Sequence, residues 1–298
     1  MSWTDMSMKF ALSTLALPPG DHRQWLACLP AWGFGGVVLV PSRLWADWPD
    51  PAQVALYRRA VEQAGLAVAA LHVPAGDYPL LNLLAGDGVG EEGDPAAHLL
   101  RLSALARDLG ATTLVIGHGR WCRELPMDGA WARCFDLLDR VLPVLESQGV
   151  QLCFEPLGPG DGDFCTRASE CRILTNAVDH PALGLQLNAR ALVENGESGH
   201  SVFAAIYGRL ESFTVNEPGL LPLGSTGRVD HAAMRRHLAA SGYEGWVVLE
   251  QKFMERGFPD GLEQSAALLL ERYCRQDNLS LARHDAAFRA APGVALLH

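Results

Sequence analysis

The feature that most constrains the fold of this chain is a regular alternation of short apolar runs with longer amphipathic stretches. Eight runs have the length of buried strands, and each is followed by loop residues such as Gly, Pro or Asn. The stretches between them are typical of helices, as in 130–146, where apolar residues recur at three-and-four spacing. The eight runs span residues 9–15, 36–41, 67–73, 112–117, 150–155, 183–188, 212–216 and 246–250.

Strand and helix in alternation predict parallel pairing, because each helix carries the chain back before the next strand begins. Eight such units over roughly 250 residues fit a closed barrel better than an open doubly wound sheet. We therefore expect an α/β fold, a (β/α)₈ TIM barrel in a single domain. The Pro/Gly-rich stretches at 86–95, 158–162 and 218–227 are short enough for loops. The barrel should span residues 8–275, and residues 276–298 should form a C-terminal tail or an extra helix.

The charge and cysteine content exclude several classes of protein. The 24 basic residues against 34 acidic ones give a net charge of −10 without a long basic cluster, which disfavours a nucleic-acid partner. No apolar stretch reaches the ~20 residues of a membrane helix, so no membrane partner is expected. Seven cysteines without a CxxC pair argue for a reducing compartment. The sequence therefore predicts a cytoplasmic protein that acts on a small-molecule substrate.

Two glutamates and two histidines stand near the ends of predicted strands, where barrel enzymes keep their sites. Glu155 ends the fifth run and Glu250 the eighth, so their carboxylates are expected to face each other across the barrel mouth. Such a pair suits removing a proton from one face of a carbon and returning it to the other. His72 and His118 add groups that titrate near neutrality or bind a substrate oxygen. This is isomerase or epimerase chemistry, with the two glutamates as catalytic pair.

Two pairs of polar residues share inward faces of the sixth and seventh predicted strands. Alternation along a strand places Gln186 with Asn188 and Thr214 with Asn216. One interpretation is a substrate-binding surface to which Asn188, Thr214 and Asn216 contribute. The other is a buried layer in which these polar groups satisfy one another. The sequence leaves both open.

Lys252 is one of only two lysines and lies two residues after Glu250. The same alternation predicts that its ammonium points into the barrel mouth, partly desolvated beside that carboxylate. There it would be a catalytic cation for a substrate oxyanion, or a Schiff-base lysine. Further candidates near strand ends are Arg190 and Glu217 for substrate binding, Arg43, Arg120 and Arg123 for a phosphate or carboxylate, and Trp45 and Trp48 as an apolar wall.

Several short sequence motifs occur along the chain in the same order as in a known superfamily. The chain resembles the sugar phosphate isomerase/epimerase superfamily, the xylose-isomerase-like TIM barrels, over about 9–273. The resemblance implies a barrel enzyme of carbohydrate metabolism, an isomerase or epimerase, from which this chain has diverged. The matching motifs are Gly33-Phe34-Gly35-Gly36-Val37, Leu109-Gly110-Ala111, His118-Gly119, Phe154-Glu155-Pro156, His180-Pro181, Gly184-Leu185, Gly227-Arg228-Val229-Asp230, Gly242-Tyr243-Glu244-Gly245-Trp246 and Leu249-Glu250.

The resemblance also implies a divalent metal held by Glu, Asp, His and Glu from strands five to eight. Glu155 and Glu250 match this pattern, but Asn188 replaces the Asp and Thr214 the His, and neutral oxygens bind transition metals more weakly. Binding of Mn, Mg or Zn by Glu155, Asn188 and Glu250 is therefore left open. The absence of GxxxxGK[ST] means that no nucleotide cofactor is expected.

Three functions remain open from the sequence. The first is an isomerase or epimerase that moves a proton on a small polyol, sugar or keto substrate. The second is a diverged lyase, dehydratase or cyclase of specialised metabolism that uses Lys252. The third is a barrel without catalytic activity that binds a small molecule. A homo-oligomer is also left open by the sequence.

Overall fold

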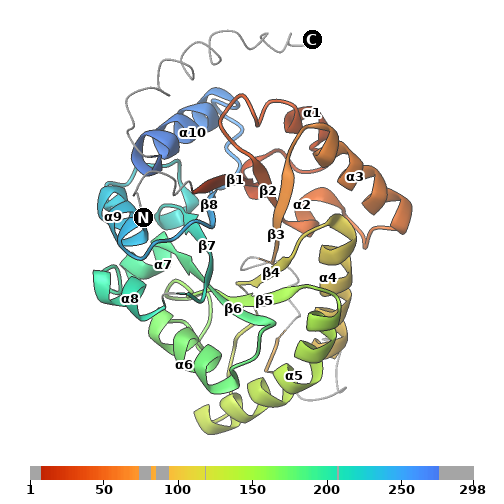
Figure 1. Cartoon of the computed structure of the whole chain (residues 1–298), viewed down its shortest axis with the longest axis vertical. Coiled ribbons are helices and arrows are strands. Elements are labelled where there is room, and N and C mark those ends of the chain that lie inside the picture. Colours follow the sequence, from red (N-terminus) through yellow and green to blue (C-terminus); the bar gives the residue numbers. More distant parts are fainter. Residues whose placement is uncertain (1–7, 74–81, 85–93, 118, 207, 275–298) are drawn as a thin grey trace, which may run out of the picture.

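Eight parallel strands close into one barrel in chain order, so the predicted (β/α)₈ TIM barrel is confirmed (Figure 1). The computed structural model describes residues 8–73, 82–84, 94–117, 119–206 and 208–274. His118 and the predicted tail at 276–298 lie outside the described residues. The strands are β1 Lys9–Ser13, β2 Gly36–Leu39, β3 Ala67–Val73, β4 Thr113–Ile116, β5 Gln151–Phe154, β6 Leu183–Asn188, β7 Leu210–Val215 and β8 Trp246–Leu249.

Each strand pairs with its neighbours, and β1 closes the barrel on β8 with Lys9 opposite Trp246. All eight predicted runs contain a strand, with ends that differ by a few residues at most. One of these differences matters for the site, because β8 ends at Leu249 rather than continuing to residue 250.

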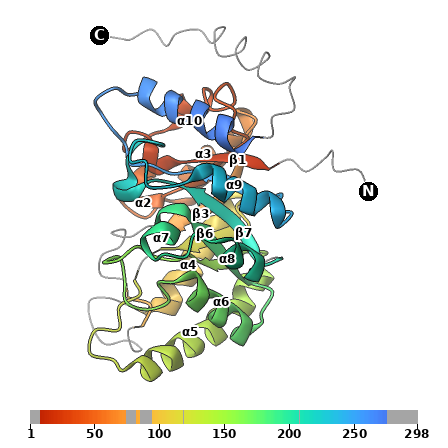
Figure 2. The ribbon, with the colours of Figure 1, turned by 90° about the vertical axis from the view of Figure 1, so that its left-hand side faces the viewer.

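Helices surround the barrel on its outside, as the two views in Figures 1 and 2 show. The stretch predicted as helical at 130–146 lies within α5, which begins earlier at Met127. Asp50 caps α3 through a capping box, and Gly110 ends α4 in the left-handed conformation. The α-helices are α1 Arg23–Leu26, α2 Pro41–Leu44, α3 Pro51–Gln63, α4 Pro95–Leu109, α5 Met127–Ser147, α6 Ala168–Val178, α7 Ala189–Glu194, α8 His200–Ala205, α9 His231–Ala240 and α10 Asp260–Tyr273; two short 3₁₀ helices are η1 Thr14–Ala16 and η2 Pro218–Leu220.

Two apolar clusters form the core. The larger one lies between the outward faces of the strands and the helices. The smaller one fills the barrel interior with mostly small side chains, as expected where strands converge. Its members are Ala11, Val38, Ala69, Ala70, Val115, Cys153 and Val248.

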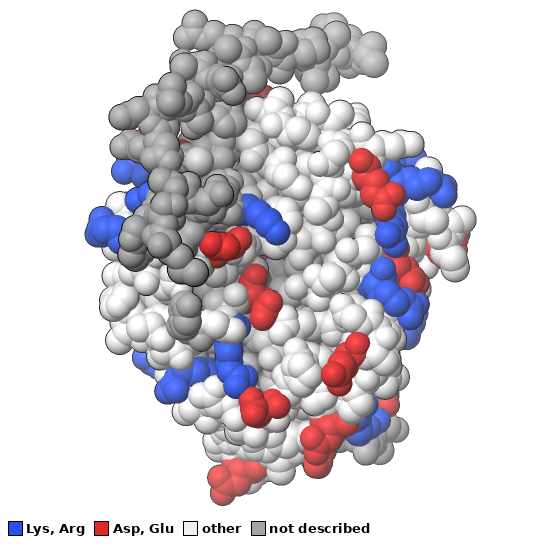
Figure 3. Space-filling model, in the orientation of Figure 1, with Lys and Arg blue, Asp and Glu red and all other residues white. Residues whose placement is uncertain are grey.

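The part of the chain that the structure describes contains no helix long and apolar enough to cross a membrane. On the face shown in Figure 3, acidic and basic side chains are interspersed around a largely uncharged centre. The charges on this face therefore do not gather into one basic stripe.

Candidate active site at the carboxyl ends of the strands

A buried histidine bridges two buried glutamates in the barrel interior. Nε2 of His72 lies 3.0 Å from Oε1 of Glu155, and Nδ1 lies 3.2 Å from Oε1 of Glu250. The three side chains come from the ends of β3, β5 and β8, and each residue is at most 4% exposed. The sequence placed all three near the mouth, and the structure brings them into direct contact.

The strand alternation explains why these side chains point inward. Glu155 lies two residues after Cys153, which belongs to the interior cluster, and Glu250 lies two residues after Val248. Although β8 has ended at Leu249, the backbone N–H of Glu250 still donates to the carbonyl of Val215 on β7. Glu250 therefore keeps the register of the strand.

Hydrogen-bond chemistry determines the charge of the bridge. A carboxylate only accepts hydrogen bonds, so an imidazole that faces two carboxylates through both ring nitrogens must donate from both, as an imidazolium. Burial disfavours this cation, but the two glutamates, Glu155 above all, outweigh burial and raise the pKa of His72 to about 10. Burial also opposes ionisation of Glu155, yet the His72 cation and the amide of Asn188 leave the pKa of this carboxyl below its ordinary value.

Side-chain amides complete the hydrogen bonding of both carboxylates. Oε2 of Glu155 accepts from Gln186 at 2.9 Å and from Asn188 at 3.3 Å. Oε2 of Glu250 accepts from Asn216 at 2.9 Å. Gln186 also donates to the hydroxyl of Thr214 at 2.9 Å, so the predicted polar faces of strands six and seven form one network.

The start of α7 fixes the orientation of two of these amides. Oδ1 of Asn188 accepts the backbone N–H of Ala191, and Oδ1 of Asn216 accepts the backbone N–H of Arg190. Because a backbone N–H only donates, each amide must turn its oxygen to the helix and its NH₂ group to a glutamate. Both glutamates are thus held by donors that cannot rotate without losing a bond.

Gly117 makes room for the Glu155 carboxylate. A Cβ at this position would overlap Oε1 of Glu155 and lie 3.2 Å from Nε2 of His72. Sequence reasoning did not identify this residue, because a glycine after a strand is ordinarily a loop signal.

Arg120 supplies a second buried cation next to the site. Its guanidinium is fully buried, donates to the backbone carbonyls of Glu155 and Cys165, and lies over the ring of Phe154. Its positive charge contributes to the lowered pKa of Glu155. Arg120 therefore supports the end of β5 rather than facing a ligand.

Arg190 lies at the rim and is bound by acidic neighbours. Its guanidinium pairs with Asp161 at 2.6 Å and reaches Glu194 at 4.0 Å. A substrate anion would have to compete with these carboxylates for the Arg190 guanidinium. The backbone N–H of Arg190 has a separate role, because it orients Asn216.

The structure corrects the expected position of Glu217. Its carboxylate is fully buried and accepts from Nε2 of His231, from the backbone of Gly224 and from the hydroxyl of Thr226. His231 in turn contacts the hydroxyl of Tyr273 at 2.9 Å. Glu217 therefore braces the loop after β7 against α9 and α10, away from the barrel interior, because its parity differs from that of its inward neighbour.

Lys252 differs from the sequence expectation in its burial. Its side chain is exposed, so the expected desolvation beside Glu250 is wrong. The physical reason is that the strand has ended. The backbone N–H of Lys252 donates to Leu220 in the η2 turn, not to β7, and the alternation of faces no longer applies. The buried neighbour is Gln251.

Two predicted wall residues pack on helices instead. Trp45 lies edge-on to Tyr57 of α3, with ring centroids 5.7 Å apart. Trp48 is partly exposed, and the guanidinium of Arg101 on α4 lies 4.2 Å from the centre of its ring.

The donor set does not suit a divalent metal. The two Oε1 atoms that would ligate it face His72, and the amides of Asn188 and Asn216 present N–H groups instead of oxygens. Within the described ranges, no group of three or more His, Cys, Asp or Glu side chains is arranged to hold a metal ion. Metal binding by Glu155, Asn188 and Glu250 stays a prediction, and it would require these side chains to rearrange.

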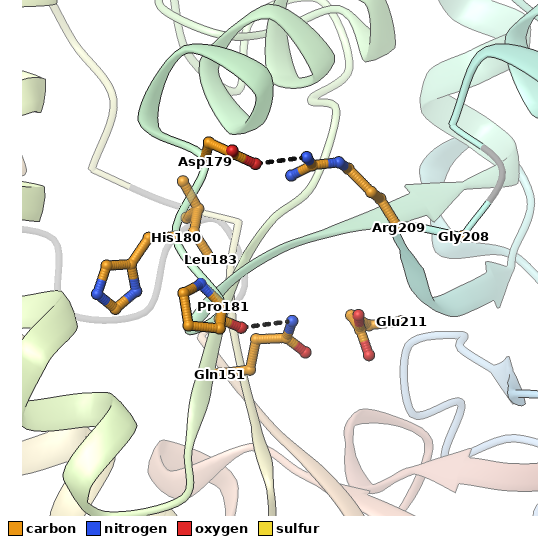
Figure 4. Close-up of a pocket in the computed structure, with 8 residues that line it drawn as sticks. All are labelled: Gln151, Asp179, His180, Pro181, Leu183, Gly208, Arg209 and Glu211. Carbon is orange, nitrogen blue, oxygen red and sulfur yellow. Dashed lines mark hydrogen bonds and ion pairs between the residues drawn. The ribbon is translucent and has the colours of Figure 1, made fainter.

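A cavity of about 440 Å³ lies at the opposite end of the barrel (Figure 4). It is an open hollow at the amino ends of β5, β6 and β7, and Arg209 pairs with Asp179 at its edge. It is therefore separate from the histidine–glutamate site. Its lining residues are Gln151, Asp179, His180, Pro181, Leu183, Gly208, Arg209 and Glu211.

Comparison with known proteins agrees with this architecture. A sequence model described as the xylose isomerase-like TIM barrel matches residues 27–272. A D-psicose 3-epimerase from Clostridium cellulolyticum H10, solved with D-tagatose, has a TM-score of 0.72 at 18% identity, covering 95% of this chain and 97% of that chain. A 3-keto-D-glucoside 4-epimerase from E. coli has a TM-score of 0.72 at 16% identity, covering 89% and 100%. An AP endonuclease, family 2, from Brucella melitensis reaches 0.71 at 18% identity, covering 89% and 98%. At these identities the likeness shows the fold.

The His72 bridge predicts a dependence of stability on pH. Because folding raises the pKa of His72 from 6.5 to about 10, its contribution is fully present below pH 6.5 and is lost as the pH rises through about 10. His72→Gln should lower the free energy of unfolding by about 3–5 kcal/mol at neutral pH, because two buried carboxylates lose their cation. Urea unfolding of both proteins between pH 6 and 10 measures this difference. A difference that stays constant across that range would contradict the bridge.

Gly117→Ala tests the close packing at Glu155. The added methyl group must displace the carboxylate, so we expect a loss of about 1–3 kcal/mol in the free energy of unfolding. Gly261→Ala in α10 is the matched control, because its Cβ would meet nothing within 4 Å. Thermal unfolding of the two variants should separate them clearly; equal melting temperatures would show that the space at Gly117 is not needed.

Proposed function

Since this chain belongs to the family of xylose isomerase-like TIM barrels, we propose that it is an enzyme that isomerises or epimerises a small sugar, polyol or keto compound. The observation that carries the proposal is the placement of Glu155 and Glu250 on either side of His72 in the barrel interior. Two carboxylates on opposite sides of one group are what proton removal and return at a single carbon require.

The hydrogen bonds support different tasks for the two carboxylates. A carboxylate offers about four lone-pair sites; among the described side chains, three donors occupy those of Glu155 and two occupy those of Glu250. Glu250 thus has more accepting capacity left for a substrate proton. We assign it the first step, removal of a proton from the carbon next to a carbonyl, which leaves an enediolate.

His72 supplies the proton for the return step. Nε2 of His72 releases its proton to Glu155, and Glu155 then becomes the acid that protonates the opposite face of the carbon. The proton count balances: Glu250 keeps the proton taken from the substrate, His72 ends neutral with its proton on Nδ1, and Glu155 ends ionised, which is the arrangement that the reverse reaction requires. Exchange with solvent, in which Glu250 loses one proton and Nε2 of His72 gains one, restores the starting state. During the first step the imidazolium also supplies a positive charge near the developing enediolate, and such a charge acts strongly in a buried site.

Lys252 has no part in this proposal, because its exposed ammonium is not held against either glutamate. The lyase alternative, in which Lys252 assists by cation electrostatics or a Schiff base, gains no support from an exposed ammonium. The solved epimerases of this fold make ketoses such as D-fructose, D-tagatose and D-allulose the first substrates to test.

The test is proton exchange and product formation with a panel of ketoses in D₂O, followed by NMR. Glu155→Gln and Glu250→Gln should each reduce turnover by about 10²- to 10⁴-fold, because the amide keeps the volume but accepts no proton. Glu211→Gln is the matched control, since this half-buried glutamate lies at the amino end of β7. Near-normal turnover in both Glu155→Gln and Glu250→Gln would refute the pair. Ligand binding without exchange in the unmodified protein would favour the barrel that only binds.

A further inference from the structure

The charges buried around the two glutamates already sum to zero. Glu155 and Glu250 bring two negative charges, and His72 between them brings one positive charge. Arg120 brings the second, since its buried guanidinium donates to the backbone carbonyl of Glu155. A divalent cation added to this arrangement would leave two uncompensated positive charges in a buried region, which is strongly unfavourable.

The hydrogen bonds lead to the same result independently. Oε1 of each glutamate faces a ring nitrogen of His72. The amides of Asn188 and Asn216 cannot offer oxygens, because the backbone at the start of α7 holds those oxygens. A metal could bind to these carboxylate oxygens only after the His72 side chain had moved away or been removed.

We propose that His72 takes the place of a divalent cation between Glu155 and Glu250, so that the site works without a metal and a metal site appears only when His72 is removed. The inference rests on the proposed function only for the role of the His72 charge in catalysis. Its central claim concerns the binding of a divalent cation. In the proposed reaction, His72 would provide the electrostatic stabilisation of the enediolate.

The test is calorimetric titration of MnCl₂ into chelator-treated protein, with free Mn²⁺ followed by electron paramagnetic resonance. The unmodified protein should bind no stoichiometric Mn²⁺. His72→Ala vacates the space and releases both Oε1 atoms, so it should bind one Mn²⁺ at least about tenfold more tightly than the unmodified protein. Adding Glu250→Gln to His72→Ala should abolish that gain.

Matched variants separate a metal site from general loosening of the structure. His231→Ala removes another buried histidine that contacts a glutamate, Glu217, and should gain no Mn²⁺ affinity. His72→Lys retains a cation between the carboxylates and should also exclude Mn²⁺. If His72→Ala does not fold, His72→Gln, which is closer in volume, takes its place in the titration.

Two results would overturn the inference. One is tight, stoichiometric Mn²⁺ binding by the unmodified protein that Glu250→Gln abolishes. The other is a folded His72→Ala or His72→Gln variant with no gain in Mn²⁺ affinity. Neither measurement requires turnover, so failure of this inference is distinguishable from failure of the proposed reaction.

Discussion

The pairing of two buried carboxylates with one imidazolium is the interaction on which the site depends. A buried charge without a partner costs several kcal/mol, so the two carboxylates inside the barrel need a cation between them. His72 meets both because the closed barrel brings β3, β5 and β8 together around one interior. Barrel closure and charge compensation therefore support each other.

The short helix α7 links the fold to the chemistry. Its first backbone N–H groups hold the oxygens of Asn188 and Asn216, which turns the amide N–H groups toward the glutamates. In an apolar interior a hydrogen bond to a carboxylate is stronger than in water, and these donors help to hold both carboxylates in place. Asn188 and Thr214 thus belong to one connected polar layer with Gln186.

Two candidate residues, Lys252 and Glu217, differ from the sequence expectation for different reasons. Alternation along β8 predicts a desolvated Lys252 beside Glu250. Alternation holds only while the backbone hydrogen bonds to β7 continue, and these hydrogen bonds stop after Glu250. Glu217 is an acidic residue just after β7, but its carboxylate turns outward to His231, which lies fourteen residues later on α9. The expectation for Lys252 fails because the strand has ended, whereas Glu217 points outward as its parity along β7 dictates.

The sequence by itself determined the eight strands, the order in which they alternate with helices, and the inward face that carries His72, Glu155, Gln186 and Glu250. These follow from periodicity, which is a local property of the chain. Only the tertiary structure decided that one imidazole spans the two glutamates, that the amides present their N–H groups, and that Gly117 provides the space for Glu155. These three features depend on distances across the closed barrel, where residues far apart in the chain meet. They also depend on side-chain rotation, because several hydrogen-bond partners compete for the same groups.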